Sequence, residues 1–148
     1  MPGLTTREPK LIFPGLAGFY AKVSDLWYPM IRIAFAGCLI SHGWSKLMSG
    51  AEAIAPGMAK SGFVPGLFFA YAAIVLETIG AVCVGAGLFT RFFAAAIAIE
   101  MALITFVVQW PRGFARMETA VMFGIVFFAI ALRGGGPYSL DRVIGKEL

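Results

Sequence analysis

Charged residues are scarce in this sequence, and no stretch gathers charge of one sign. Aspartate, glutamate, lysine and arginine make up 14% of the 148 residues, against about 25% in a typical soluble domain. Apolar residues make up 59%, and the mean hydropathy is +0.84. This composition excludes a soluble globular domain and a disordered chain. The net charge of +4 comes from scattered basic residues that form no stripe along which phosphates could lie, so we expect no nucleic-acid partner.

Cysteine is also scarce. Cys38 and Cys83 lie far apart inside apolar stretches, and the sequence has no C-x-x-C motif. Two cysteines are too few for a disulfide-stabilised secreted module, and the missing motif excludes two-cysteine thiol–disulfide chemistry. We interpret both as small packing residues, which is the common role of cysteine in an apolar helix.

Signals for a bound cofactor are missing as well. No G-x-G-x-x-G motif follows a strand-like run, which argues against an intrinsic flavin or nicotinamide site. His42 is the single histidine, and Lys46 lies one turn away. Zinc needs several converging ligands and haem commonly needs a second axial one. We therefore expect no intrinsic cofactor and no metal site.

Long apolar runs dominate what is present. About 87 residues are apolar, and a membrane-spanning helix uses about 20. Four runs are each long enough to cross the hydrocarbon core, and the fourth is near the short limit. These runs are Leu26–Leu47, Gly66–Phe89, Phe92–Trp110 and Met117–Leu132. The sequence predicts an all-α polytopic membrane protein with a bundle of four transmembrane helices. Residues 48–65 hold three glycines and two prolines, and we expect them to form a loop.

The basic residues predict the orientation of the chain. With four spans, both termini lie on the same side as the short loop between the second and third runs. That side carries Arg7, Lys10, Lys22, Arg91, Arg133, Arg142 and Lys146, and the opposite side carries Lys46, Lys60, Arg112 and Arg116. Because basic residues accumulate in cytoplasmic loops, we expect both termini in the cytoplasm.

The N-terminal segment has an amphipathic pattern. Residues 11–27 place apolar side chains on nearly one helical face, and Lys10 and Lys22 flank them. We predict a helix that lies on the cytoplasmic membrane surface or packs on a partner subunit, and the pattern suits both equally. The chain is thus divided into a cytoplasmic tail with this interfacial helix (1–25), a membrane domain (26–142) and a short cytoplasmic tail (143–148).

Ionisable residues at membrane depth are the strongest functional signal, because each costs about 2.5–3.5 kcal/mol at the centre of a span and usually faces the bundle interior. The candidates for a polar cavity or ligand site are Arg32, His42, Lys46, Glu77, Glu100 and Glu118. Arg32, His42 and Lys46 share one face of the first run, and Glu77 and Glu100 fall near the midplane. This placement allows an ion pair between Arg32 and Glu77.

Two interpretations of these charges remain open. They line a polar cavity that carries protons or holds a polar head group, or they only fix how the helices align. Glu100 has no obvious second cation, so we expect it to be protonated or to face a ligand, since desolvation disfavours the charged form. No catalytic residue can be assigned.

Small residues predict where helices approach one another. Gly37, Ser41 and Ser45 lie on one face of the first run, roughly opposite its charged residues. A second set, Ala94, Ala98 and Ala102, lies on one face of the third run. Such ridges allow close contact between helices in a membrane.

The order of several short motifs resembles the DoxX family. They are Arg32, His42-Gly43, Lys46-Leu47, Glu77 with Gly80, Gly87-Leu88-Phe89-Thr90-Arg91, Gly136 and Ser139-Leu140-Asp141, over residues 27–142. The resemblance implies a four-helix protein of the bacterial inner membrane. It also implies an association with quinone-linked oxidation, including subunits of thiosulfate:quinone oxidoreductases, and with membrane complexes that handle oxidative or thiol stress.

Three functions are therefore weighed. The first is a non-catalytic membrane subunit of a redox system that binds an amphipathic ligand such as a quinone, or anchors a partner oxidoreductase. The second is transport of a small molecule or of protons through Glu77 and Glu100, which the missing inverted repeat weakens. The third is a purely structural subunit. The expected partners are the lipid bilayer and either further copies of the chain or other membrane and redox subunits.

Overall fold

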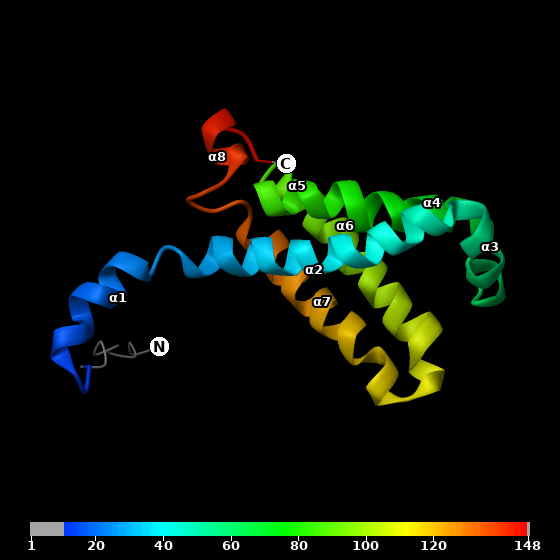
Figure 1. Cartoon of the computed structure of the whole chain (residues 1–148), viewed down its shortest axis with the longest axis horizontal. Helices are drawn as coiled ribbons and strands as arrows, with labels where there is room; N and C mark the ends of the chain where they lie inside the picture. The colour runs from blue at the N-terminus through cyan, green and yellow to red at the C-terminus, as the bar shows by residue number, and fades with distance from the viewer. Residues whose placement is uncertain (1–10, 148) are drawn as a thin grey trace, which may run out of the picture.

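The computed structural model describes residues 11–147, and nearly all of this range is helical (Figure 1). No β-strand occurs within these residues. The α-helices are α1 (Ala17–Val23), α2 (Trp27–Ser49), α3 (Ala51–Lys60), α4 (Gly66–Val75), α5 (Ala81–Ala86), α6 (Thr90–Leu103), α7 (Phe114–Arg133) and α8 (Leu140–Ile144). Two π-helical segments, η2 (Leu76–Gly80) and η3 (Ile104–Gln109), and two 3₁₀ turns, η1 (Pro14–Leu16) and η4 (Trp110–Arg112), complete the chain.

Three continuous helices are long and apolar enough to cross a membrane: Gly66–Ala86, Thr90–Arg112 and Phe114–Arg133. A fourth is present when Pro14–Val23 and Trp27–Ser49, which meet at a bend of 53°, are taken as one span. Helix α2 is less apolar than the others because it contains Arg32, His42 and Lys46. The prediction of an all-α polytopic membrane protein is confirmed, with three or four candidate spans.

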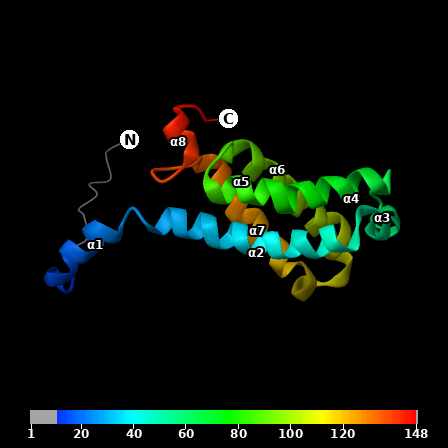
Figure 2. The same cartoon turned by 45° about the horizontal axis from the view of Figure 1, so that its top comes forward.

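The helices pack in two pairs. Helix α2 runs beside the continuous α4–η2–α5 helix, and α6 runs beside α7 (Figures 1 and 2). Contacts of α6 with η2 and α5 join the two pairs. Their shared core contains Leu39, Ala81, Val84, Ala94, Ile97, Met101, Phe127 and Ile130. Helices α2 and α7 diverge toward the start of α7 (Figure 1). A cavity lies between α2 and α7 on that side.

The small-residue ridge predicted on α2 meets no other helix among residues 11–147. Gly37, Ser41 and Ser45 are exposed, and a Cβ atom on Gly37 would meet nothing within 4 Å. The contact face instead includes Gly43, where a Cβ atom would lie 2.6 Å from the backbone carbon and oxygen of Glu77. Glycine is needed here because the backbones of α2 and η2 touch. The second predicted ridge holds in part: Ala94 and Ala98 are buried, and Ala102 is exposed.

The predicted loop over residues 48–65 is largely wrong. Gly50 does end α2, with a φ of 82°. However, residues 51–60 form helix α3 despite Pro56 inside it. Ala51 of α3 joins Ala70 and Ile74 of α4 in a small apolar cluster. Tertiary packing therefore outweighs the helix-breaking tendency of these residues.

The N-terminal helix stands apart from the bundle. Residues 14–23 form η1 and α1, which is shorter than the segment predicted as amphipathic (Figure 2). The apolar side chains of Leu16, Phe19 and Tyr20 are exposed. None of these three side chains belongs to the bundle core, and the contact of this face with lipid or with a partner stays a prediction. Lys10, which flanks the predicted helix, lies outside the described residues.

Candidate functional site

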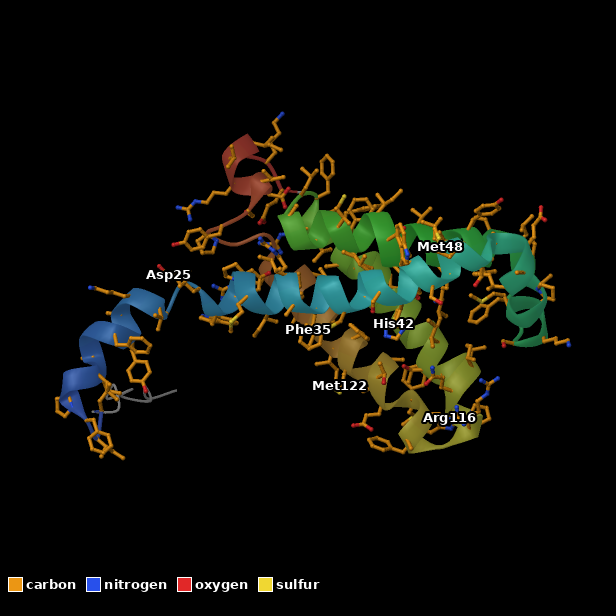
Figure 3. All side chains as sticks on the ribbon, viewed as in Figure 1. Asp25, Phe35, His42, Met48, Arg116 and Met122 are labelled. Atoms are coloured by element: carbon orange, nitrogen blue, oxygen red, sulfur yellow. The ribbon has the colours of Figure 1, made fainter. Side chains whose placement is uncertain are left out.

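A polar cleft opens between α2 and the η3–α7 segment. Its volume is about 320 Å³. Its polar lining comes from His42, Lys46, Glu77, Gln109, Arg116 and Thr119, and its apolar walls come from Leu39, Met101, Ile104, Ala120 and Phe123. Figure 3 shows His42 on α2 and Arg116 near the start of α7, on the side where the two helices diverge. Three of the residues predicted from the sequence, His42, Lys46 and Glu77, thus line one cavity.

Lys46 and Glu77 form an ion pair at the wall of the cleft. The lysine Nζ donates to Oε1 of the glutamate. The Glu77 side chain is 2% exposed and the Lys46 side chain 27%, so a partly exposed ammonium pairs with a buried carboxylate. The second oxygen, Glu77 Oε2, has no hydrogen-bond partner among residues 11–147. A buried polar atom without a partner is costly, so this oxygen is a candidate acceptor for a hydrogen bond from a bound molecule.

Both π segments border this cleft. Glu77 lies in η2, and Gln109 is the last residue of η3. The side-chain oxygen of Gln109 is a second buried acceptor for which the described residues supply no donor. Short π stretches inside α-helices often occur at functional sites, because they re-aim the side chains of one turn. Two buried acceptors without a donor from residues 11–147 therefore belong to residues that line the same cleft.

The ion pair expected between Arg32 and Glu77 does not form. Arg32 is 1% exposed and donates instead to the carbonyls of Gly135 and Tyr138, the latter at 2.6 Å. Glu77 packs against Gly43, eleven residues further along α2, which is roughly 16 Å at 1.5 Å per residue. An arginine side chain cannot cover that distance. The prediction estimated how deep each residue lies in the membrane by counting from the end of its apolar run. That count gave the wrong position of α2 along η2.

Arg32 belongs to a second polar cluster, which fastens the C-terminal segment to the bundle. Nearby, the hydroxyl of Tyr28 donates to the carbonyl of Gly134, and the Arg133 guanidinium lies over the Tyr28 ring, 4.5 Å from its centroid. Seven hydrogen bonds that involve a side chain join residues 134–147 to the preceding part of the chain, so we call this cluster the C-terminal clasp. Its members are Tyr28, Arg32, Arg91, Arg133, Asp141 and Glu147.

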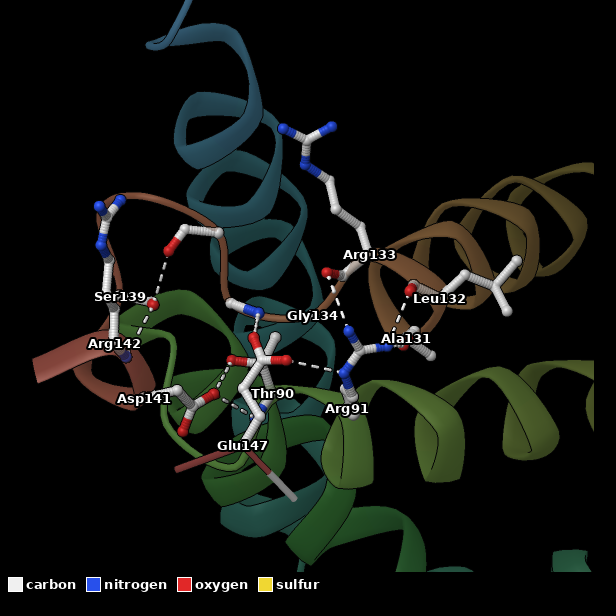
Figure 4. Close-up of polar contacts among 12 residues, drawn as sticks. Thr90, Arg91, Ala131, Leu132, Arg133, Gly134, Ser139, Asp141, Arg142 and Glu147 are labelled. Carbon is white, nitrogen blue, oxygen red and sulfur yellow. Dashed lines mark hydrogen bonds and ion pairs between the residues drawn. The ribbon is translucent and has the colours of Figure 1, made fainter. Parts of the chain in front are cut away.

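Asp141 and Glu147 complete the C-terminal clasp (Figure 4). The Asp141 carboxylate accepts from the backbone N–H groups of Phe89 at 2.7 Å and Thr90 at 3.0 Å, and from the Thr90 hydroxyl at 2.6 Å. It thereby caps the start of α6, whose first N–H groups have no partner within the helix. Glu147 accepts from Arg91 Nε and from the backbone N–H of Gly135, both at 2.8 Å. These bonds hold the pKa of Glu147 below its usual value, the Arg91 contact contributing most.

Glu100 lies beside the cleft but in a different cavity. It lines a smaller pocket of about 150 Å³ between α4 and α6, whose other lining residues are apolar. Glu100 Oε2 is buried and has no partner within residues 11–147. The carboxyl is within electrostatic range of Glu77 and Lys46. Ile104 lines both the cleft and this pocket and forms the wall between them.

The remaining predicted residues have different surroundings. Glu118 is exposed and is not part of the cleft lining. His42 is exposed at the mouth of the cleft, where its ring meets the Phe123 ring edge to face at 5.9 Å. Within residues 11–147, no three side chains of His, Cys, Asp or Glu gather as a metal site would require.

Three polar lining residues were missed from the sequence: Gln109, Arg116 and Thr119. Gln109 follows a run of apolar residues, and its polarity was a usable signal. Arg116, Thr119, Ala120 and Phe123 follow the spacing of one helical face on α7, which carries the far wall of the cleft. Arg116 was taken for a loop residue because the apolar run begins after it.

Comparison with known proteins decides the family. Residues 29–110, which run from the start of α2 to η4, match the DoxX family model. The chain belongs to the DoxX family. The match includes His42, Lys46, Glu77 and Glu100 and ends before α7, so the α7 wall of the cleft lies outside it. No curated protein and no solved structure matches the chain.

Proposed function

We propose that this DoxX protein is a membrane subunit that binds an amphipathic small molecule such as a quinone, with the polar head of the ligand in the cleft between α2 and α7. The observation that carries this proposal is the unpaired Glu77 Oε2, buried in the lining of that cleft. The hydroxyl group of a quinol can donate to this oxygen, and Lys46, Arg116 and Thr119 can donate to the carbonyl oxygens of a quinone.

A quinone and its reduced form suit this arrangement of polar groups. The carbonyl oxygens of a quinone accept hydrogen bonds from Lys46, Arg116 or Thr119, and the hydroxyl groups of a quinol also donate to Glu77 or Gln109. The apolar side chains of Met101, Ile104 and Phe123 provide surfaces for a ring. The ligand's apolar tail would leave through the opening between α2 and α7 toward lipid.

The redox chemistry itself would come from a partner. A quinone accepts two electrons, and no side chain in the cleft can supply them. We therefore propose a non-catalytic subunit that holds the quinone and anchors an oxidoreductase at a bacterial inner membrane, with both termini in the cytoplasm. The scarcity of charge on the lipid-facing helices and the excess of basic residues near the termini support this placement. Transport and a purely structural role remain the alternatives to this function.

A binding experiment tests the proposal. The protein is reconstituted in lipid nanodiscs and titrated with decylubiquinone, a quinone with a short apolar tail, and with its reduced form, whose hydroxyl groups can donate to Glu77 Oε2. We expect saturable binding that is weakened at least tenfold in Thr119→Val and Gln109→Leu, which remove polar groups from the cleft without stranding a charge. The control variant Glu118→Gln changes an exposed carboxyl outside the cleft and should bind as the unaltered protein does.

Mild purification gives an independent readout. Lipid extraction and peptide mass spectrometry of the eluted material identify co-purifying quinone and partner subunits. Quinone in the extract supports the proposal. Stable partner subunits together with no saturable decylubiquinone binding would contradict it and favour a structural subunit.

A further inference from the structure

The pocket beside Glu100 has a chemistry unlike that of the cleft. Its lining is apolar apart from the one carboxyl, and three phenylalanines, Phe63, Phe68 and Phe69, form part of it. The ring centroids of Phe63 and Phe69 are 5.1 Å apart, and those of Phe68 and Phe69 are 5.3 Å apart. An aromatic cluster and a carboxyl thus share a space of about 150 Å³.

The charges around this pocket do not balance when Glu77 and Glu100 are both ionised. Lys46 is paired with Glu77, so that cation is already committed. The charged groups within electrostatic range of Glu100 are Glu77 and Lys46. His42 and Arg116 line the cleft with them, and none of the four lines this pocket. Among residues 11–147, Glu100 is the only titratable side chain in the pocket lining. Since these residues supply no cation to the pocket, neutrality at Glu100 needs either a proton or a bound cation.

We propose that this pocket binds the cationic head of a lipophilic ammonium compound, which replaces the proton of Glu100. The O–H bond of the Glu100 carboxyl breaks, its proton passes to water, and the carboxylate forms an ion pair with the ammonium; no electron is transferred. Aromatic faces attract quaternary ammonium groups, because the negative face of each ring stabilises the cation. The carboxylate and the phenylalanine rings are then complementary to one head group.

The size of the pocket selects the part of the ligand that enters. Drug-sized ligands occupy about 300–1,000 Å³, and this pocket holds about 150 Å³. It therefore admits a compact head such as trimethylammonium and not a ring system with substituents. Phe68 is 65% exposed, so the apolar tail has a route to lipid along α4. This inference goes beyond the proposed function and does not depend on quinone binding in the cleft.

The test compares a cation with a neutral molecule of the same shape. The protein in nanodiscs is titrated calorimetrically with dodecyltrimethylammonium, and with the analogue in which carbon replaces the nitrogen. We expect each bound cation to release one proton. Cation affinity should therefore rise by up to about tenfold per pH unit over the pH range in which Glu100 is protonated. We expect the neutral analogue to bind at least tenfold more weakly at high pH, with no pH dependence.

Two variants and one control complete the test. Glu100→Gln should abolish the preference for the cation, Phe69→Leu should weaken cation binding several-fold more than binding of the neutral analogue, and Glu118→Gln should change neither. Equal binding of cation and neutral analogue by the unaltered protein would overturn the proposal and leave an apolar cavity only. Cation binding that is unchanged in Glu100→Gln would assign the signal to partition into the bilayer. If Glu100→Gln does not fold, the comparison of the two ligands and Phe69→Leu still decide.

Discussion

Lys46 reaches from α2 to pair with Glu77, which lies thirty-one residues later in the π segment η2, and leaves one oxygen of that carboxylate without a partner. The pair forms because Gly43, one turn before Lys46, lets the backbones of the two helices touch. One close approach therefore determines both which cation neutralises Glu77 and where the cleft opens. The same contact excludes Arg32 from the site.

The first prediction concerns this pair. Glu77→Gln should destabilise the protein by roughly 1–3 kcal/mol, because it leaves the Lys46 ammonium without its counter-charge. The loss should be smaller than the about 3–5 kcal/mol seen for fully buried pairs, since Lys46 is 27% exposed. Thermal unfolding in one detergent measures the change.

The double variant Lys46→Met with Glu77→Met tests the cause. It leaves no charge stranded, so much of the lost stability should return, whereas the exposed control Glu118→Gln should unfold at the same temperature as the unaltered protein. A double variant that is less stable than Glu77→Gln would show that the pair contributes more than charge neutralisation.

The close approach at Gly43 gives a second prediction, with a matched control on the same helix. Gly43→Ala puts a methyl group 2.6 Å from the backbone of Glu77, so α2 and η2 must separate, and we expect a loss of about 1–3 kcal/mol from overpacking. Gly37→Ala meets nothing within 4 Å and replaces glycine in a helix interior, so it should be neutral or slightly stabilising. Equal thermal stability of the two variants would contradict the packing described for this face.

Much of the fold follows from hydropathy, because apolar runs near 20 residues separated by turn-forming residues have few other structures available in a membrane. The candidate site could be predicted from the sequence only in part. His42, Lys46 and Glu77 were identified because ionisable residues in apolar runs are rare. Their partners depend on how far one helix slides along another, and residue counts along single helices do not contain that offset. Arg32 was therefore paired with the wrong group, and Arg116 was missed.

The structural role assigned to Arg32 leads to a third prediction. Arg32→Met removes the donors to the carbonyls of Gly135 and Tyr138, of which the Gly135 carbonyl is buried, and a buried carbonyl without a donor costs about 1–3 kcal/mol when no water replaces the arginine. Hydrogen–deuterium exchange should become faster across residues 134–147. Decylubiquinone binding should be retained, since Arg32 does not line the cleft. If Arg32→Met loses decylubiquinone binding while residues 134–147 stay protected from exchange, Arg32 contributes to the ligand site and the structural role is contradicted.

Asp141 provides a fourth prediction within the C-terminal clasp. Asp141→Ala removes the acceptor of two backbone N–H groups at the start of α6 and of the Thr90 hydroxyl. Loss of such a cap costs about 0.5–2 kcal/mol. The expected change is a lower unfolding temperature with faster amide exchange at Phe89 and Thr90. In Asp141→Asn one side-chain oxygen is kept, so a smaller loss should result, and an equal loss would indicate that charge rather than hydrogen bonding stabilises this turn.

The last prediction is a pH dependence at the end of the chain. Hydrogen bonds from Arg91 and from the Gly135 backbone lower the pKa of Glu147 in the folded protein, whereas an unfolded glutamate titrates near about 4.3. The folded protein therefore binds this proton less readily than the unfolded chain. The contribution of Glu147 to stability is complete above the unfolded pKa and is lost as the pH falls through the lower, folded pKa.

Amide exchange of residues 134–147, compared between the unaltered protein and Glu147→Gln, measures this contribution. The two proteins should differ at pH 7 and converge in strong acid, and high salt should reduce the difference because the Arg91 contact is exposed. A difference that persists at the lowest pH would show that Glu147 holds the segment through packing and not through its charge.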